Sequence, residues 1–393
     1  QQVFSTCSVE TIMKILRFAI FLMLLPTASP AQESLLLNEA FIDDAQQAVD
    51  SVYNLNYEAS LKIMQPWRDD HPDHPVWAFW SALEIWWKIL PDIENTEHDK
   101  AFYDALDEAK RISKERLQKQ KDIDALIVKS MSYGFSARHL SNRGSWYRSI
   151  RDARTAMGYV SDIENMLPDL GDIQFGLGIS QYFSAFLREH YPIIRPFAWM
   201  LPRGDRGDGL ERLNIAADNS TFLVPEATFF LGHIYLHYEQ NFTDALDYLQ
   251  ELTRRYPNNG YYHRLLIRSY DNNNNRRAAM KLINQTLNKW DDKNSAPDLA
   301  LKEELHLLRG RILKLQGRED QALEDLLIAY RTGETMKPEG ERQNFIRASY
   351  YIGNIYLAWG ERKTAEYFLK KVAASDLDFG YVDSAKSLLR REF

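Results

Sequence analysis

The chain has 393 residues, of which 45% are hydrophobic, 12% aromatic and 26% charged, with a formal net charge of −7. This hydrophobic and aromatic content excludes an intrinsically disordered chain, and the negative balance argues against a protein that binds nucleic acid over its whole surface. Cys7 is the only cysteine, so neither an intramolecular disulfide nor a thiolate zinc site can form.

The start of the chain is predicted to precede the folded protein. Residues 1–12 look like an upstream extension without structure. Residues 13–31 have the pattern of a secretory signal peptide, with a positively charged start, a short apolar core and small residues before a cleavage site near Ala31. The apolar core is too short for a comfortable membrane span. We therefore expect an exported protein, periplasmic or secreted, whose mature chain begins near Gln32 and contains no transmembrane span.

Residues 32–170 are predicted to form helical repeats rich in aromatic residues. Amphipathic patterns at 36–53 and 57–69 indicate a first pair of helices. Five of the nine tryptophans follow within residues 67–87, where a buried helix is the favoured explanation and an aromatic ligand cage the alternative. Two histidines and three carboxylates gather at Asp69–His74, where an exposed, proline-stiffened turn is favoured over a metal site.

Residues 171–209 interrupt the pattern with glycines and prolines. Gly176 and Gly178 lack the further glycine and the Lys-Ser/Thr pair of a phosphate-binding loop, so close helix packing is the favoured explanation. The apolar stretch Ile193–Leu201 is expected to cover the end of a core, with a peripheral membrane contact as the alternative. Asp208 is predicted to cap the helix that follows a glycine-rich turn.

Residues 210–393 are predicted to form an array of helix hairpins of a single kind. In the clearest unit, 226–258, a short break at Asn241 separates two amphipathic helices, and Pro257 stops the second. The unit carries its characteristic residues at Leu231, Gly232, Tyr235, Ala245, Leu249 and Pro257. The positions equivalent to Gly232 in the later units are Ile267, Gly310 and Gly353.

This pattern resembles that of tetratricopeptide-repeat (TPR) proteins, whose repeat is about 34 residues long. Residues 171–258 resemble more narrowly the tetratricopeptide-repeat-39 and inclusion-body-clearance family and its bacterial relatives, on the turn Gly204-Asp205-Arg206 followed by Gly209-Leu210. The resemblance implies an all-α fold, an α-solenoid of antiparallel helix hairpins in a TPR-like superhelix. It also implies a scaffold without known catalysis.

The same resemblance places a ligand groove on the concave face formed by the first helix of each hairpin. The expected groove residues are Glu226, Phe229, His233, His237, Tyr261, Arg264, Arg268, Glu304, Arg311, Lys314, Arg347, Tyr350 and Asn354. Five of them are Arg or Lys on a negatively charged molecule, so the groove is expected to attract an acidic segment or a chain-terminal carboxylate of a partner protein. The alternative is that these long side chains only keep the face soluble.

No sequence motif of a known catalytic site is present, so we expect a non-enzymatic scaffold without metal or cofactor that binds a protein or peptide and no nucleic acid. His233 and His237 lie four residues apart and share one helix face, a spacing that also suits a metal ion. The alternative function is therefore a metal-dependent or other enzyme that uses these two histidines.

Overall fold

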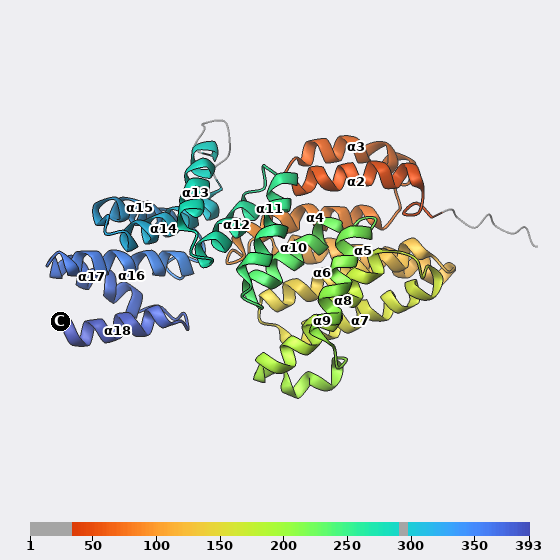
Figure 1. The fold of residues 1–393 in the computed structure, drawn as a ribbon. Helices are drawn as coiled ribbons and strands as arrows, with labels where there is room; N and C mark the ends of the chain where they lie inside the picture. Colours follow the sequence, from red (N-terminus) through yellow and green to blue (C-terminus); the bar gives the residue numbers. More distant parts are fainter. Residues whose placement is uncertain (1–33, 291–297) are drawn as a thin grey trace, which may run out of the picture.

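The computed structural model describes residues 34–290 and 298–393, and every regular element in these ranges is a helix (Figure 1). The predicted signal peptide and upstream extension lie outside the described residues. The helices, in chain order, are α2 (Glu39–Tyr53), α3 (Tyr57–Asp70), α4 (Val76–Ile89), η1 (Leu90–Asp92), α5 (Asp99–Lys119), α6 (Ile123–Asn142), α7 (Trp146–Met166), α8 (Asp172–His190), η2 (Pro192–Met200), α9 (Arg206–Asn219), α10 (Val224–His237), α11 (Phe242–Arg255), α12 (Gly260–Asn272), α13 (Arg276–Trp290), α14 (Leu299–Leu315), α15 (Glu319–Glu334), α16 (Gln343–Ala358), α17 (Arg362–Ala373) and α18 (Gly380–Glu392).

Successive helices pair as hairpins, and the glycines of the repeat signature lie where two helices of one hairpin touch. The three contacts are Gly232 with Leu249, Gly310 with Leu326 and Gly353 with Leu369, where an added β-carbon would meet the leucine at 3.0, 2.7 and 3.0 Å. A side chain at any of these positions would displace the packed leucine, so the close contact favours glycine and is a reason for its recurrence in the sequence. The predicted all-α fold of stacked helix hairpins is confirmed.

The N-terminal helices do not extend away from the repeats but pack back onto α10, α11 and α12. The Tyr256 hydroxyl donates to Asp50 at 2.6 Å, and the Asn259 side-chain amide donates to the carbonyl of Tyr53 at 2.7 Å. The Tyr53 hydroxyl donates in turn to Glu226 at 2.6 Å. Helices α2–α12 therefore form a larger lobe that closes on itself, and α13–α18 extend from it as a smaller lobe (Figure 1).

The tryptophan-rich stretch supplies the core of this closure. Trp86 is fully buried, and its ring contacts that of Phe102 at 5.6 Å between centroids. Trp87 is 2% exposed and packs edge-on against Tyr262 of α12 at 5.4 Å. These tryptophans fill the space between helices far apart in the sequence, as expected for a buried helix rather than a ligand cage.

Glycines bring α8 and α9 into close contact, as the sequence predicts. A β-carbon on Gly178 would lie 2.9 Å from Leu213, and one on Gly209 would lie 2.6 Å from the backbone nitrogen of Tyr182. The predicted helix cap is wrong: Asp205, not Asp208, caps α9 by accepting from the amide of Asp208 at 2.8 Å. Starting the helix at Arg206 lets that side chain pair with Glu239 near the end of α10.

The proline-containing stretch η2 contacts α7 and α8 and has two different sides. Ile194 is fully buried and covers the lobe, whereas Trp199 is 75% exposed. Ile194 of η2 therefore covers the end of a core as expected, and the membrane contact at Ile193–Leu201 stays a prediction. None of the helices in the described ranges combines the length and the apolar composition needed to cross a bilayer.

A buried carboxylate anchors the start of the described chain. Asp124 on α6 accepts hydrogen bonds from the amide of Leu35 at 2.7 Å, from the Ser34 hydroxyl, and from His74 Nε2 at 3.1 Å. The Val76 amide donates to His74 Nδ1, so the proton lies on Nε2. His74 is 4% exposed, which corrects the expectation that all the polar residues of Asp69–His74 face solvent.

Candidate functional site: the concave surface of α10 to α16

The first helices of successive hairpins, α10, α12, α14 and α16, form one inner row. Helix α12 contacts α14, and α14 contacts α16. Between α10 and α12, the rings of Phe229 and Tyr261 lie 6.0 Å apart. The first helices are thus adjacent as the repeat pattern predicts, and the binding role of the groove residues on them stays a prediction.

The N-terminal helices fill the first part of this surface. Glu226, Phe229, Tyr261 and Arg264 are each exposed by 9% or less. The guanidinium of Arg138, from α6, covers the Phe229 ring at 4.9 Å and donates to Glu226 at 3.1 Å. These four residues were expected to line an open groove, and the structure instead buries them, because the closed larger lobe occupies the space in front of them.

The middle of the surface is basic but internally neutralised. Glu304 of α14, 3% exposed, pairs with Arg264 at 3.3 Å and also with Arg268. Burial alone would raise the pKa of Glu304, but the charges of Arg268 and Arg264 outweigh burial and lower it. Arg311 likewise pairs with Asp271. The predicted positive charge of the groove is thus smaller than the sequence indicates.

The last part of the surface remains accessible. Arg347 of α16 is half-buried, and its guanidinium donates only to the Gln343 side chain at 3.4 Å and lies 5.6 Å from the centre of the Phe379 ring. Arg347 Nε has no acceptor among the described residues, and the same holds for Arg311 Nε. Lys314 forms no ion pair with any residue in the described ranges. We call Arg268, Arg311, Lys314, Arg347 and Tyr350 the open groove.

The side chain of Asn354, the last of the predicted groove residues, faces its own helix. Its side-chain amide donates to the carbonyl of Tyr350 at 2.7 Å. The Tyr350 ring in turn packs edge-on against Tyr381 of α18, with 5.1 Å between centroids. Tyr350 therefore helps to join α16 to α18, and Arg347 is a more available polar group of α16 than Asn354.

His233 and His237 lie side by side on α10, with 4.5 Å between ring centroids. Burial is the main reason why the pKa of His233 lies well below its usual value, and the nearby His237, Arg138 and Arg268 lower it further. Burial and Arg268 also lower the pKa of His237 to about 4, although its exposed edge lets water screen part of this effect.

The positive charges of Arg138 and Arg268 beside the two histidines oppose the binding of a metal ion. No group of three possible ligands that could hold a metal occurs in the part of the chain that the structure describes.

These histidines predict a loss of stability in weak acid. The unfolded chain takes up a proton on each histidine near pH 6.5, whereas the folded protein keeps His233 neutral to lower pH. The unfolded state therefore binds more protons as the pH falls from about 6.5 to 5, and the free energy of unfolding should decrease over this window. Urea titrations should show a shallower decrease for His233→Phe. The exposed His71→Gln serves as the control, and equal slopes for all three proteins would contradict the assignment.

An acidic segment of the larger lobe lies against the edge of the inner row. We call residues Pro91–Glu94, which follow α4, the acidic loop. Arg342, at the start of α16, pairs with Asp92 at 2.9 Å and with Glu94 at 3.8 Å, and it also holds Glu303 of α14 at 2.9 Å. Arg342 is 2% exposed. This network joins the two lobes, and the sequence did not predict it.

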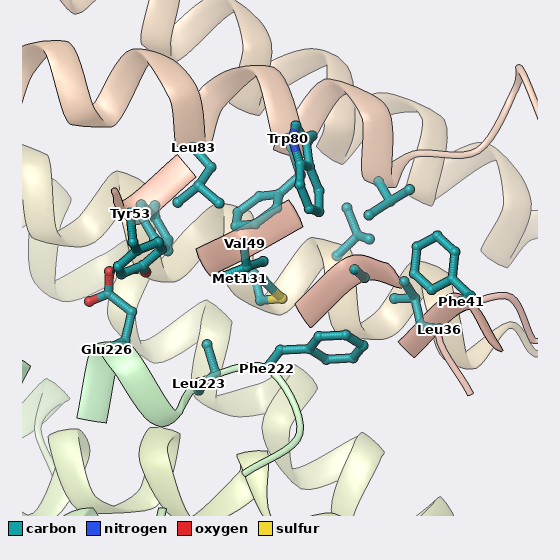
Figure 2. A pocket seen from close by; sticks show the side chains of 15 residues that line it. Leu36, Phe41, Val49, Tyr53, Trp80, Leu83, Met131, Phe222, Leu223 and Glu226 are labelled. Carbon is teal, nitrogen blue, oxygen red and sulfur yellow. Dashed lines mark hydrogen bonds between the residues drawn. The ribbon is translucent and has the colours of Figure 1, made fainter. Parts of the chain in front are cut away.

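A small cavity lies inside the larger lobe, between α2, α4 and α6 and the segment that leads into α10 (Figure 2). Its walls are apolar apart from Tyr53 and Glu226, which meet at one end in Figure 2. The space inside it that the centre of a water-sized sphere can reach is about 60 Å³. Cavities that bind a molecule such as benzene are larger, about 150 Å³, so this space is a packing gap of the closed lobe.

No protein-family model matches the chain, and no curated protein matches it. Three solved structures show a similar course of the chain. The apo form of the quorum sensor NprR from B. thuringiensis is 12% identical, with a TM-score of 0.40 over 90% of this chain and 82% of that one. Yeast Tom70 is 11% identical, with a TM-score of 0.31 over 97% and 94%. A monomeric mutant of IFIT1 with m7Gppp-AAAA is 13% identical, with a TM-score of 0.26 over 89% and 76%. The resemblance of residues 171–258 to one particular family stays a prediction, and the helix packing itself shows that the chain is an all-α protein of stacked helix hairpins.

Proposed function

We propose that the protein is a non-enzymatic scaffold that binds an acidic segment of a partner protein in the open groove. Arg347 carries this proposal: its guanidinium is half-buried on the inner row, forms no ion pair in the described ranges and leaves Nε without an acceptor there. Its charge acts on Glu94 and Glu304, but neither carboxylate forms an ion pair with it. A buried donor without an acceptor costs about 1–3 kcal/mol, which a ligand carboxylate would recover through a charge-assisted hydrogen bond. Lys314, which forms no ion pair in the described ranges, lies on the adjacent helix α14 and adds positive charge.

The test is binding of a fluorescently labelled hexaglutamate peptide, followed by anisotropy at low and moderate salt. Arg347→Glu combined with Lys314→Glu should weaken binding at least ten-fold, and salt should weaken binding to the unchanged protein. Arg264 and Arg268 are left intact because reversing either charge would leave Glu304 buried without its cation. Arg277→Glu, an exposed change on the outer helix α13, is the matched control. Equal affinity of the groove variant and the control would contradict the proposal.

We also propose that residues 13–31 direct export and that the partner is met outside the cytoplasm. The support is the charged start, apolar core and small-residue cleavage site of this segment. N-terminal sequencing of the protein recovered from the cell envelope or the medium should begin at Gln32. A chain that retains Met13 in the cytoplasmic fraction would contradict export.

A further inference from the structure

The acidic loop is bound by the smaller lobe and by α12 in the way that a short peptide would be. The carbonyl of Pro91 accepts from Arg264 at 2.8 Å. The Asp92 carboxylate accepts from Arg342 at 2.9 Å, and Glu94 accepts from the backbone amide of Gln343 at 3.1 Å. One backbone carbonyl and two carboxylates two residues apart are thus recognised together. All the donors lie about 170 or 250 residues away in the sequence.

The loop and Arg347 of the open groove meet at the same residue, Gln343. The backbone amide of Gln343 donates to Glu94 at 3.1 Å, and its side chain accepts from Arg347 at 3.4 Å. Burial raises the pKa of Glu94, and the nearby charge of Arg347 opposes this effect. An acidic segment bound in the groove and the acidic loop would compete for neighbouring positive charges.

The contact is also one that can be released without unfolding the loop. The Asp92 and Glu94 side chains remain 19% and 24% exposed at the edge of the row. On its other side, the segment after η1 is held by Arg143 of α6, which donates to the carbonyl of Asn95 at 3.1 Å and pairs with Asp99. The loop is thus anchored in the larger lobe independently of Arg342.

We propose that the acidic loop is an internal occupant of the acid-binding surface. The partner presents the same pattern, a short helical turn with two carboxylates two residues apart, and binds by displacing the loop from Arg342 and Arg264. This inference rests on the proposed function. It adds the chemistry of the partner segment and the expectation that the loop weakens the binding of such segments to the free protein.

A peptide with the sequence of residues 88–97, labelled at its N-terminus, is the probe. The mature chain carrying Asp92→Asn and Glu94→Gln should bind it at least ten-fold more tightly than the unchanged chain, because the internal competitor is weakened. The control chain carries Glu97→Gln and Asp104→Asn, two nearby carboxylates that do not touch the smaller lobe, and should match the unchanged chain. A peptide with the same two neutral replacements as the loop variant should not bind.

The result that overturns the inference is equal affinity of the peptide for the loop variant and for the unchanged chain. Circular dichroism and a cooperative melting curve establish that the variant is folded. If the double variant does not melt cooperatively, Glu94→Gln alone is measured, and no gain in affinity then overturns the inference as well. Hexaglutamate binding that depends on Arg347 would still support the proposed function, so the two failures can be told apart.

Discussion

Replacing Arg342 with alanine should lower the free energy of unfolding by about 3–5 kcal/mol, the usual cost of removing one partner from a buried ion pair. The guanidinium is 3% exposed and bonds Glu303, whose side chain is fully buried, at 2.9 Å. Burial disfavours the charged arginine, but the hydrogen bonds from Glu303 and Asp92 outweigh it and hold the pKa of Arg342 above its usual value. Without Arg342, the Glu303 carboxylate has to be desolvated unpaired or protonated.

Urea unfolding at neutral pH, followed by circular dichroism, measures this loss. Arg254→Ala removes an arginine of the same size from an exposed pair with Glu251 and should change stability by less than about 1 kcal/mol. The double variant Arg342→Met with Glu303→Leu should recover much of the loss, since neither charge then stays buried alone. A loss for Arg342→Ala no greater than that of Arg254→Ala would mean that the network contributes nothing to stability.

Replacing Gly209 with alanine should destabilise the protein by about 1–3 kcal/mol, the range found for overpacked cores. The added β-carbon would lie 2.6 Å from the backbone nitrogen and 2.8 Å from the α-carbon of Tyr182. These are backbone atoms of α8, so no side-chain rotation relieves the overlap and the two helices must separate. Tyr182 and Leu213 are fully buried at this crossing, so the separation also loosens the core.

Gly134→Ala is the matched control and should have the opposite sign. Gly134 lies within α6, and a β-carbon there meets nothing within 4 Å. Alanine should therefore stabilise the helix by about 0.5–1 kcal/mol, because it loses less backbone freedom on folding. Thermal and urea unfolding of both variants measure these changes. A Gly209→Ala protein as stable as the unchanged protein would contradict the packing argument.

The hairpins of the C-terminal half could be predicted from sequence because each depends on contacts within one repeat. Gly232 and Leu249 are 17 residues apart, with one turn between their helices, and the equivalent pairs Gly310–Leu326 and Gly353–Leu369 are each 16 residues apart. A contact that recurs at a fixed short separation leaves a periodic signal that a single sequence reveals. The inner row and the position of Arg347 on it follow from the same period.

The repeat period could not predict whether the groove residues are open to solvent or covered. Phe229 and Arg264 occupy groove positions by their period, but Arg138 and Pro91 from distant helices cover them. Contacts between such distant residues leave no period in the sequence. The density of tryptophans in residues 67–87 was the one available signal, since it exceeds what the face of a single hairpin can bury. Arg342 had no signal, because it lies in a loop between repeats.

The closure of the larger lobe also determines the order in which the protein can fold during synthesis. Tyr53 and Asn259, which bond each other, are 206 residues apart, so the first hairpin emerges long before its partner surface exists. Until α12 is complete, the aromatic faces around Trp87 and Tyr53 stay uncovered, the condition in which nascent chains aggregate or require a chaperone. The smaller lobe, built from neighbouring contacts, can form as soon as each hairpin is translated. The N-terminal half is thus synthesised first, but its folding is completed only after α12 has been made.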